Sequence, residues 1–378
     1  MLRVPFVLAI SLGAIGLGAA CARSKPAQDP PSRAAEPQAN GTPLPPPPKP
    51  QVPAVEIAGS PEQRGRDLYA RMCVVCHGEH GEGYKADQAT ALAQPDFLAS
   101  VSDNFLGFSI AFGRPGTTMS AWYTGAGGPL SFPEIKALTA FIRTWQTQPS
   151  KSLNEAEPHG DVAQGKVVFE RECQRCHGDA APNVRILKQH FLAHTTPGFL
   201  RYALQTGRPP TAMPSYRETL GDQGIEDVVT YLWSLPRVID ALAPSRPPPI
   251  PLGPVPLNAK GSEPRGFQAY PKMTSVAVVS EQLARKARMV VADARVPSDY
   301  ERGHIAGAVS VPFYEPEPYF AKLPKSTWIV CYCGCPHAES GALAHKLALA
   351  GFSKVTVLDE GLGEWQSKGH PMREGRAP

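Results

Sequence analysis

Residues 73–77 read Cys-Val-Val-Cys-His, residues 173–177 read Cys-Gln-Arg-Cys-His, and these two pentapeptides decide the fold of residues 58–238. A second shared pattern follows each of them. Residues 113–119 read Gly-Arg-Pro-Gly-Thr-Thr-Met, and residues 207–213 read Gly-Arg-Pro-Pro-Thr-Ala-Met. Because two patterns recur in the same order, the chain contains two copies of one structural unit.

The C-x-x-C-H spacing is that of covalent haem attachment. Two thiols three positions apart on a helical turn can form thioethers with the two vinyl groups of one haem, while the adjacent imidazole points at the iron. We therefore expect two covalently bound haem c groups. The expected attachment points and His ligands of the iron are Cys73, Cys76, His77, Cys173, Cys176 and His177.

Such a haem commonly takes a Met thioether as its sixth ligand. The chain has seven Met residues. Met1 lies in a predicted signal, Met72 abuts its own motif, and three more lie beyond residue 264, so elimination leaves Met119 and Met213. The alternatives are three histidines near the motifs: His80, His190 and His194.

Helix signals flank both motifs. Ser60 with Gln63, and Asp161 with Gln164, form the capping pattern of a helix that starts just before each pentapeptide. Apolar residues recur at helical spacing in residues 135–145 and 225–235. We expect a helix to carry each motif and a closing helix to pack against it.

Other interpretations of the paired cysteines explain less. A thioredoxin-like redox centre needs a strand before the motif, and neither copy has a strand pattern there. A single zinc site made of four cysteines leaves the two adjacent His and the two Met residues without a role. Arg114 and Arg208 either neutralise haem propionates or are solvated side chains before a proline turn.

At this point the chain resembles the class I cytochrome c family over about 180 residues in two copies. More narrowly, residues 95–98 and 113–122 are similar to the oxidase-associated cytochromes. The resemblance implies two all-α domains, each a small helical bundle around a haem. It also implies one-electron transfer with redox partner proteins, such as other cytochromes and oxidase or reductase complexes.

The pattern changes after residue 264. Short apolar segments at 289–292, 328–332 and 355–358 read as strands between helical stretches, which predicts an α/β domain with a parallel sheet. Residues 293–295, 300–308, 360–365 and 369–371 resemble the rhodanese-like domain, and the resemblance covers nearly all of the last 110 residues. It implies a catalytic Cys that a strand delivers into an anion-cradling loop at a helix start.

Cys333 matches that nucleophile best, with the following helix expected to begin near Ser340. The loop departs from the family pattern because it lacks the usual Arg, and Cys331 and Cys335 flank the expected cysteine. Three possibilities stay open: sulfur transfer with a small sulfur compound, a redox or metal site of Cys333, Cys335 and His337, and a catalytically silent interaction module.

The N-terminal residues predict export. Residues 1–20 have the layout of a secretory signal, and Cys21 after it resembles the lipidated cysteine of bacterial lipoproteins, although Gly18 stands where Leu is usual. The alternative is an ordinary signal that leaves a thiol. Residues 21–57 are a Pro-rich tether, which would reach on the order of 100 Å if fully extended.

The predicted organisation is therefore a signal peptide, a tether and three domains. The cytochrome c domains span residues 58–150 and 158–238, and a Pro-rich linker at 243–262 precedes the rhodanese-like domain at 264–378. With 38 basic and 34 acidic side chains, the charge balance does not indicate a nucleic-acid partner.

These features predict a periplasmic, lipid-anchored di-haem electron carrier with an accessory rhodanese-like domain. The alternative is a sulfur-oxidising or sulfurtransferase enzyme that uses Cys333 and the haems as electron acceptors.

Overall fold

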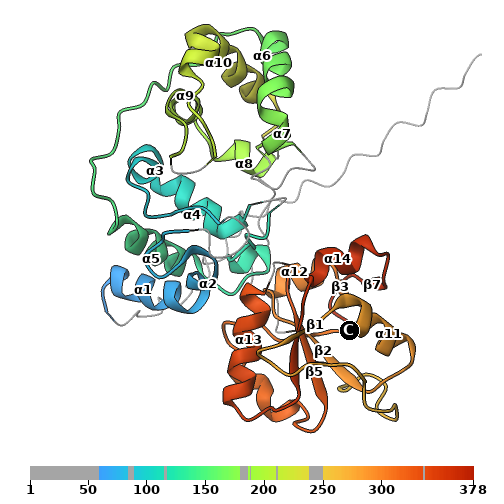
Figure 1. The fold of residues 1–378 in the computed structure, drawn as a ribbon. Helices are drawn as coiled ribbons and strands as arrows, with labels where there is room; N and C mark the ends of the chain where they lie inside the picture. The colour runs from blue at the N-terminus through green and yellow to red at the C-terminus, as the bar shows by residue number, and fades with distance from the viewer. Residues whose placement is uncertain are drawn as a thin grey trace, which may run out of the picture. The chain divides into compact units, whose positions relative to one another are not determined.

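The computed structural model describes residues 59–83, 89–114, 117–178, 186–187, 189–209, 212–237, 250–334 and 337–378. The predicted signal peptide, Cys21 and the tether lie outside these residues, as does segment 243–249 of the predicted linker. Residues 55–378 form one compact unit. Within it we distinguish the first domain (59–150), the second domain (158–237) and the C-terminal domain (250–378), whose elements are drawn in Figure 1.

The first domain is helical, as predicted. Its helices are α1 (Pro61–Met72), α2 (Val74–His77), α3 (Pro95–Ser100), α4 (Asp103–Phe112) and α5 (Phe132–Arg143), with a 3-10 turn at Thr124–Ala126. Ser60 caps α1 through the predicted capping box with Gln63, and Ser131 and Glu134 form a second box at the start of α5. The local signals in the sequence therefore do set these helix starts.

The second domain repeats this plan. It contains α6 (Val162–Val168), a π-helical stretch (Phe169–Cys173), α7 (Gln174–His177), α8 (Gln189–Ala193), α9 (Pro197–Thr206) and α10 (Arg217–Ser234). The side chain of Asp161 accepts hydrogen bonds from the amides of Ala163 and Gln164, which is the predicted cap of α6. The motif again sits at the end of the opening helix.

The closing helix packs against the opening helix in both copies, which confirms the prediction: α5 lies on α1, and α10 lies on α6. Glycine makes the close approach possible. A Cβ on Gly65 would lie 2.0 Å from the carbonyl oxygen of Ala137, and a Cβ on Gly165 would lie 1.9 Å from that of Asp227. The two domains therefore share their helix crossing as well as their motifs.

The C-terminal domain is built on a five-stranded parallel sheet in the order β1-β6-β5-β2-β4. The strands are β1 (Met273–Thr274), β2 (Met289–Asp293), β4 (Val309–Ser310), β5 (Trp328–Tyr332) and β6 (Val355–Leu358). A separate antiparallel pair joins β3 (His304–Ile305) to β7 (Met372–Arg373). The predicted α/β class and parallel sheet are confirmed.

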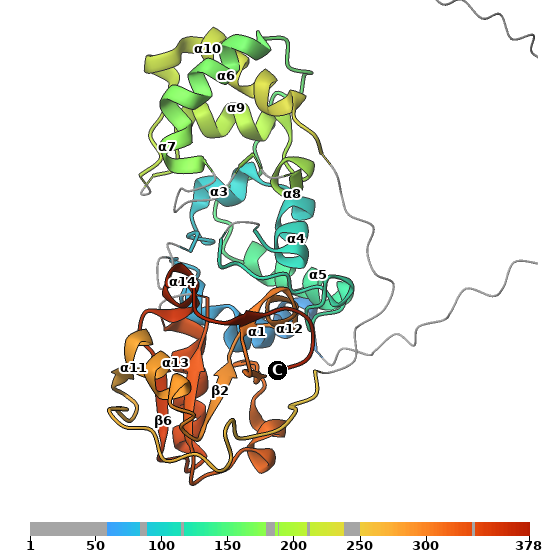
Figure 2. The same ribbon diagram turned by 90° about the vertical axis from the view of Figure 1, so that its right-hand side faces the viewer.

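Helices cover the sheet, as Figure 2 shows from a second side. They are α11 (Val276–Ala284), α12 (Pro297–Arg302), α13 (Ala338–Leu349) and α14 (Gly361–Ser367), with a 3-10 turn at Glu317–Lys322. Alternate residues of β5 enter different apolar clusters: Cys331 lies with Leu343 of α13, and Val330 lies with Trp365 of α14. Both faces of the sheet are therefore buried, as parallel strands require.

Two details refine the sequence-based boundaries. Helix α13 begins at Ala338, two residues before the expected start near Ser340, and the preceding His337 adopts a left-handed conformation (φ 72°). Within the predicted linker, Leu257 donates its amide to Met289 of β2 at 2.8 Å, so part of that segment contacts the sheet.

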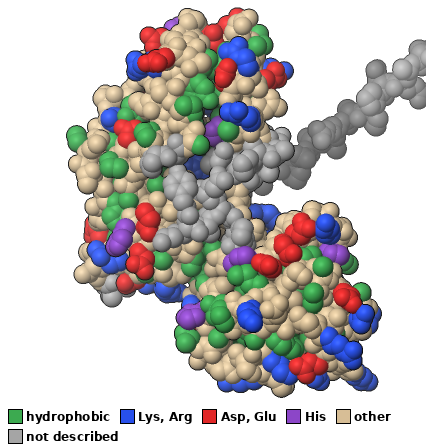
Figure 3. All heavy atoms as spheres, in the orientation of Figure 1, with side chains coloured by type: hydrophobic (Ala, Val, Ile, Leu, Met, Phe, Trp, Pro, Cys, Tyr) green, Lys and Arg blue, Asp and Glu red, His purple; other side chains and the backbone are tan. Residues whose placement is uncertain are grey.

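Charged side chains of both signs are interspersed on the face drawn in Figure 3. In the part of the chain that the structure describes, no helix has both the length and the apolar character needed to cross a membrane.

Candidate haem and cysteine sites

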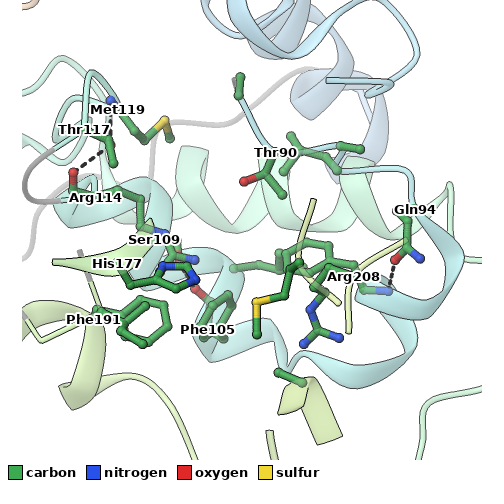
Figure 4. Close-up of a pocket in the computed structure, with 18 of the residues that line it drawn as sticks. Thr90, Gln94, Phe105, Ser109, Arg114, Thr117, Met119, His177, Phe191 and Arg208 are labelled. Carbon is green, nitrogen blue, oxygen red and sulfur yellow. Dashed lines mark hydrogen bonds between the residues drawn. The ribbon is translucent and has the colours of Figure 1, made fainter. Parts of the chain in front are cut away.

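A cavity of about 620 Å³ gathers the predicted haem ligands of both copies (Figure 4). Its lining includes all eight residues proposed from the sequence as attachment points or iron ligands: Cys73, Cys76, His77, Met119, Cys173, Cys176, His177 and Met213. Met119 and Met213 follow the first Cys of their motifs by 46 and 40 positions, and both line the same cavity as those motifs.

The rest of the cavity wall is mainly apolar. In the first domain it is formed by side chains of α3 to α5, including Phe97, Leu106, Ile110, Leu138 and Ile142, and in the second by side chains of α9 and α10, including Phe199, Leu204, Val228 and Leu232. Such a wall suits a flat macrocycle with an apolar surface.

The orientation of His77 is fixed by the backbone. Its Nδ1 lies 3.0 Å from the carbonyl oxygen of Thr90, which leaves Nε2 for another partner. Burial lowers the pKa of the His77 imidazole, an effect that the Thr90 carbonyl partly offsets, so the ring favours its neutral form. A neutral imidazole whose other ring nitrogen is held by a backbone carbonyl is the form in which His binds a metal.

The thiols of the motifs lie in apolar surroundings. Burial raises the pKa of the Cys73 thiol to about 12, and burial with the charges of Glu172 and Cys176 raises that of Cys173 to about 11. These two sulfurs are therefore neutral in the protein, which suits thioether attachment and does not suit thiolate chemistry.

The two Met residues sit in equivalent turns. The amide of Arg114 donates to the carbonyl of Met119 at 2.9 Å, and that of Arg208 donates to the carbonyl of Met213 at 3.0 Å. Each turn opens with a glycine in the left-handed region; a Cβ on Gly113 would lie 2.3 Å from the carbonyl oxygen of Met119. The shared Gly-Arg-Pro pattern is thus the sequence signature of a turn that presents Met to the cavity.

Both arginines of that pattern line the cavity and are not simply solvated. The Arg114 guanidinium stacks over Phe105 at 4.6 Å and over Phe191 at 5.2 Å, and burial lowers its pKa to about 10. Arg208 lies over Phe199 at 5.0 Å, and its Nη1 and Nη2 have no hydrogen-bond partner among the described residues.

These observations test whether the site fits a haem. The Arg208 guanidinium has only a long ion pair with Asp96, at 3.9 Å, so the hydrogen bonds that its buried Nη1 and Nη2 lack could be supplied by a haem propionate. The paired sulfurs, the neutral imidazole, the thioether and the apolar wall meet the remaining requirements of a c-type haem. The residues present therefore fit the group.

The alternative His ligands are less well placed. His80 is exposed at the surface, and its position is not part of the cavity lining described above. His194 stacks on Phe108 of α4, with ring centroids 4.2 Å apart, also away from that lining. The side chain of His190 lies outside the described residues.

The third predicted site lies at the carboxyl edge of the sheet, where ligands commonly bind in α/β proteins. Cys333 follows β5 directly and is fully buried, and its Sγ lies 3.3 Å from Oγ of Ser340 in the first turn of α13. Asp293 at the end of β2 accepts a hydrogen bond from Tyr332 at 2.6 Å and binds Arg295 at 2.6 Å.

The alternative metal site of Cys333, Cys335 and His337 lies only partly within the described residues. His337 is turned toward Asp359, with Nε2 3.1 Å from Oδ1, and Cys335 lies outside the described residues. Among the residues that are described, no three His, Cys, Asp or Glu side chains converge as a metal site. Cys331 points into the apolar layer beneath α13, and burial, followed by the charge of Cys333, raises the pKa of its thiol.

Two contributors escaped the sequence analysis. The carbonyl of Thr90 is a backbone group, so no side-chain pattern could reveal it. Ser340 was considered only as the expected start of a helix. Its position seven residues after Cys333 was the one indication in the sequence that its hydroxyl could lie near the thiol.

Comparison with known proteins agrees with this geometry. Residues 62–146 match the cytochrome c family model, and residues 160–232 match the model of the cbb3-type cytochrome c oxidase subunit III. Residues 275–368 match the rhodanese-like domain. Each domain is thus matched separately.

Three curated relatives are informative. The cbb3-type cytochrome c oxidase subunit CcoP of Azospirillum sp. is 27% identical over 202 residues, which are 48% of this chain and 64% of that protein. The HTH-type transcriptional regulator Rv0324 of Mycobacterium tuberculosis is 30% identical over 102 residues, 26% of this chain and 45% of that protein. The chain thus spans less than two thirds of the length of both.

The thiosulfate sulfurtransferase GlpE of Coxiella burnetii is 31% identical over 93 residues, which are 25% of this chain and 85% of that protein. This relative is covered over most of its length. The chain therefore carries two cytochrome c domains, which imply covalent haem c, and through its C-terminal domain it belongs to the rhodanese-like family.

Proposed function

We propose that this chain is a di-haem electron carrier of the bacterial cell envelope. The observation that carries the proposal is the repeated site: in both copies the two cysteines, the His and a Met from a Gly-Arg-Pro turn line one apolar cavity. A haem c bound at each site would accept and release one electron reversibly.

The residues around the sites have roles that match electron transfer more than substrate turnover. His77 is oriented by the Thr90 carbonyl, and the Gly-Arg-Pro turns fix the two Met residues. Arg114 and Arg208 supply positive charge at the cavity wall, where propionates would need it. Contacts with the protein hold these groups in place at the cavity wall.

The location and partners follow from the sequence. A signal peptide at residues 1–20 would export the chain, lipidated Cys21 would anchor it, and the tether would let the domains reach partners above the membrane. The similarity to an oxidase subunit supports redox proteins, including oxidase complexes, as those partners.

The experiment is to purify the mature protein from a host that attaches haem c and to record its mass and a potentiometric titration with optical detection. We expect two haem mass increments and two one-electron steps. A Cys173→Ala/Cys176→Ala variant should lose one increment and one step. A colourless wild-type protein, or a variant that keeps both haem mass increments, would end the proposal.

The second candidate is sulfur chemistry at Cys333, with electrons passed to the haems. Three observations favour it: Cys333 is buried beside Ser340 at the carboxyl edge of the sheet, a thiosulfate sulfurtransferase is 31% identical in this region, and Glu339, next to Ser340, lines the cavity that contains Cys76 and His77. The described loop supplies no Arg for an anionic substrate, so we rank it second.

The two candidates differ in one measurement. Thiosulfate or a persulfide is added to the oxidised protein while haem absorption is followed. Reduction that disappears in a Cys333→Ser variant supports the second candidate. Unchanged absorption, together with rapid electron exchange with another cytochrome, supports the first.

A further inference from the structure

The segment that follows Met119 contacts the C-terminal domain directly. The hydroxyl of Ser120 donates a hydrogen bond to Oδ2 of Asp299, the third residue of α12. Next to it, the Oγ of Ser298 lies 3.5 Å from the carbonyl oxygen of Ala121. Ser120, Ala121 and Ser298 are buried. The residues directly after the predicted sixth ligand of the first haem are therefore held by another domain.

Packing supports these polar contacts. The ring of Trp122, which lines the haem cavity, lies against the ring of Tyr314 in the C-terminal domain, with centroids 5.7 Å apart, and both side chains are buried. A Cβ on Gly127 would lie 2.9 Å from the Cβ of Ser298, so a glycine at this position lets α12 approach closely. Helix α13 also lies against α2. The C-terminal domain thus contacts both the Met119 segment and the helix that ends the first haem motif.

In the second copy, the equivalent segment is held by its own domain. Pro214 follows Met213 where Ser120 follows Met119 in the first copy, and its side chain has no hydrogen-bond donor. The next residue, Ser215, donates from Oγ to the carbonyl of Gln205 at 2.6 Å. The two copies therefore differ in what holds the segment after the Met residue: the C-terminal domain in the first copy, and the second domain itself in the second.

We propose that Asp299 is a positioning residue for Met119: by holding Ser120 it keeps the thioether on the iron of the first haem, which makes the C-terminal domain part of that haem site. This inference rests on the proposed di-haem function and extends it to the C-terminal domain. Asp299 suits the role because its two carboxylate oxygens have separate partners. Oδ1 binds Arg302 at 2.5 Å, and Oδ2 accepts the hydrogen bond from Ser120.

The chemistry of the ligand gives the direction of the effect. A Met thioether raises the potential of a haem, so by linkage it binds ferrous iron more tightly than ferric iron. A segment that is held less firmly therefore releases Met119 from ferric iron first. Without the hydrogen bond between Ser120 and Asp299, an added ligand should displace Met119 more easily from the oxidised first haem.

The test uses the full chain with both haems and imidazole as the probe, because imidazole competes with Met for ferric iron. Binding is followed through the loss of the weak near-infrared band of the Met–iron bond. In a Met213→Ala background the remaining band comes from the first haem, and in a Met119→Ala background it comes from the second. The substitutions Ser120→Ala, Asp299→Ala and Asp299→Asn are made in both backgrounds.

We expect Ser120→Ala and Asp299→Ala to lower the dissociation constant of imidazole at the first haem about tenfold, the factor that one hydrogen bond to a charged group supplies. The second haem should be unchanged. Asp299→Asn keeps an acceptor oxygen for Ser120 and should behave as the wild type, which separates the hydrogen bond from the charge. Glu301→Ala is the matched control: it removes the same charge from α12, where Glu301 binds Arg376 at 2.9 Å, and it should affect neither haem.

The outcomes distinguish this inference from the function on which it rests. A chain without haem refutes both. If both haems and their bands are present but neither Ser120→Ala nor Asp299→Ala changes imidazole binding at the first haem, the role of Asp299 is refuted and the di-haem function stands. Equal changes at the two haems, or an Asp299→Asn variant that behaves like Asp299→Ala, would also refute it. Since Ser120→Ala and Asp299→Ala remove the same bond from two different domains, either variant decides if the other does not fold.

Discussion

Nη1 of Arg208 lies 3.9 Å from Oδ2 of Asp96, so a cation that lines the second half of the haem cavity faces a carboxylate of the first domain. Asp96 is held there by further partners: the hydroxyl of Tyr202 donates to it, and the ammonium of Lys151 lies 3.4 Å away. The charge felt at the second haem site is therefore set partly by the first domain.

Replacement of Asp96 should change the reduction potential of the second haem more than that of the first. Asp96→Asn removes the negative charge that offsets Arg208, and a more positive surrounding favours the reduced state. We expect the potential of the second haem to rise by tens of millivolts, while the first changes less. A potentiometric titration of the two-haem protein measures both values.

The control is Asp67→Asn, which removes the same charge from an exposed position on α1. It should move neither potential appreciably. Equal shifts for the two variants would show that long-range charge, and not the Asp96–Arg208 pair, is responsible.

The axial Met residues can be tested one at a time. Met119→Ala should lower the potential of the first haem alone by on the order of 100 mV, because the thioether favours ferrous iron. Met213→Ala should do the same for the second haem. Each variant should also lose part of the weak near-infrared absorption band that reports a bond between Met sulfur and iron.

Met372→Ala, in the edge strand β7, serves as the control for loss of a Met side chain. It should leave both potentials and the band unchanged. If a cavity variant keeps its potential and its band, another residue is the sixth ligand at that haem.

Much of this architecture was predictable because its causes are local. The capping boxes at Ser60 and Ser131, the two motifs and the Gly-Arg-Pro turns each depend on residues within a few positions of one another. The strands of the C-terminal domain were found because both faces of a parallel sheet are buried, which makes the whole strand apolar.

The unpredicted features depend on tertiary packing. Asp96 and Arg208 lie more than one hundred positions apart in the chain. Nothing in the sequence around either residue indicates that the two side chains meet. The burial of Glu339 is equally hidden, since acidic residues are common in the first turn of exposed helices.

The stability of the second domain should depend on one buried ion pair. Arg201 donates to both carboxylate oxygens of Glu226 at 2.7 Å, and its Nη1 donates to the carbonyls of Asn154 and Ala156. Arg201→Met leaves the buried Glu226 with only the amide and imidazole of His159 beside it, which should cost about 3 kcal/mol. Hydrogen exchange in α9 and α10 reports the loss.

The same pair predicts an acid limit. The hydrogen bond from Arg201, opposed by burial and supported by the amide of His159, holds the pKa of Glu226 below its ordinary value of 4.5. A lowered pKa in the folded state stabilises the fold above pH 4.5, and this contribution is lost as the pH falls through the folded-state value. Arg201→Met should weaken this dependence, because only the contribution of His159 then lowers the pKa. Lys166→Gln, at the exposed pair with Glu170, should change stability by no more than about 0.5 kcal/mol at any pH.

The helix crossing of the first domain makes a steric prediction. In Gly65→Ala the new Cβ would lie 2.0 Å from the Ala137 carbonyl oxygen, so α1 and α5 must separate. We expect a loss of about 3 kcal/mol or more in the free energy of unfolding. Gly107→Ala, in α4, adds the same methyl group 3.7 Å from its nearest neighbour and should be neutral or stabilising by up to about 1 kcal/mol. Thermal unfolding followed by circular dichroism compares the two, and similar midpoints would show that the helices do not cross at Gly65.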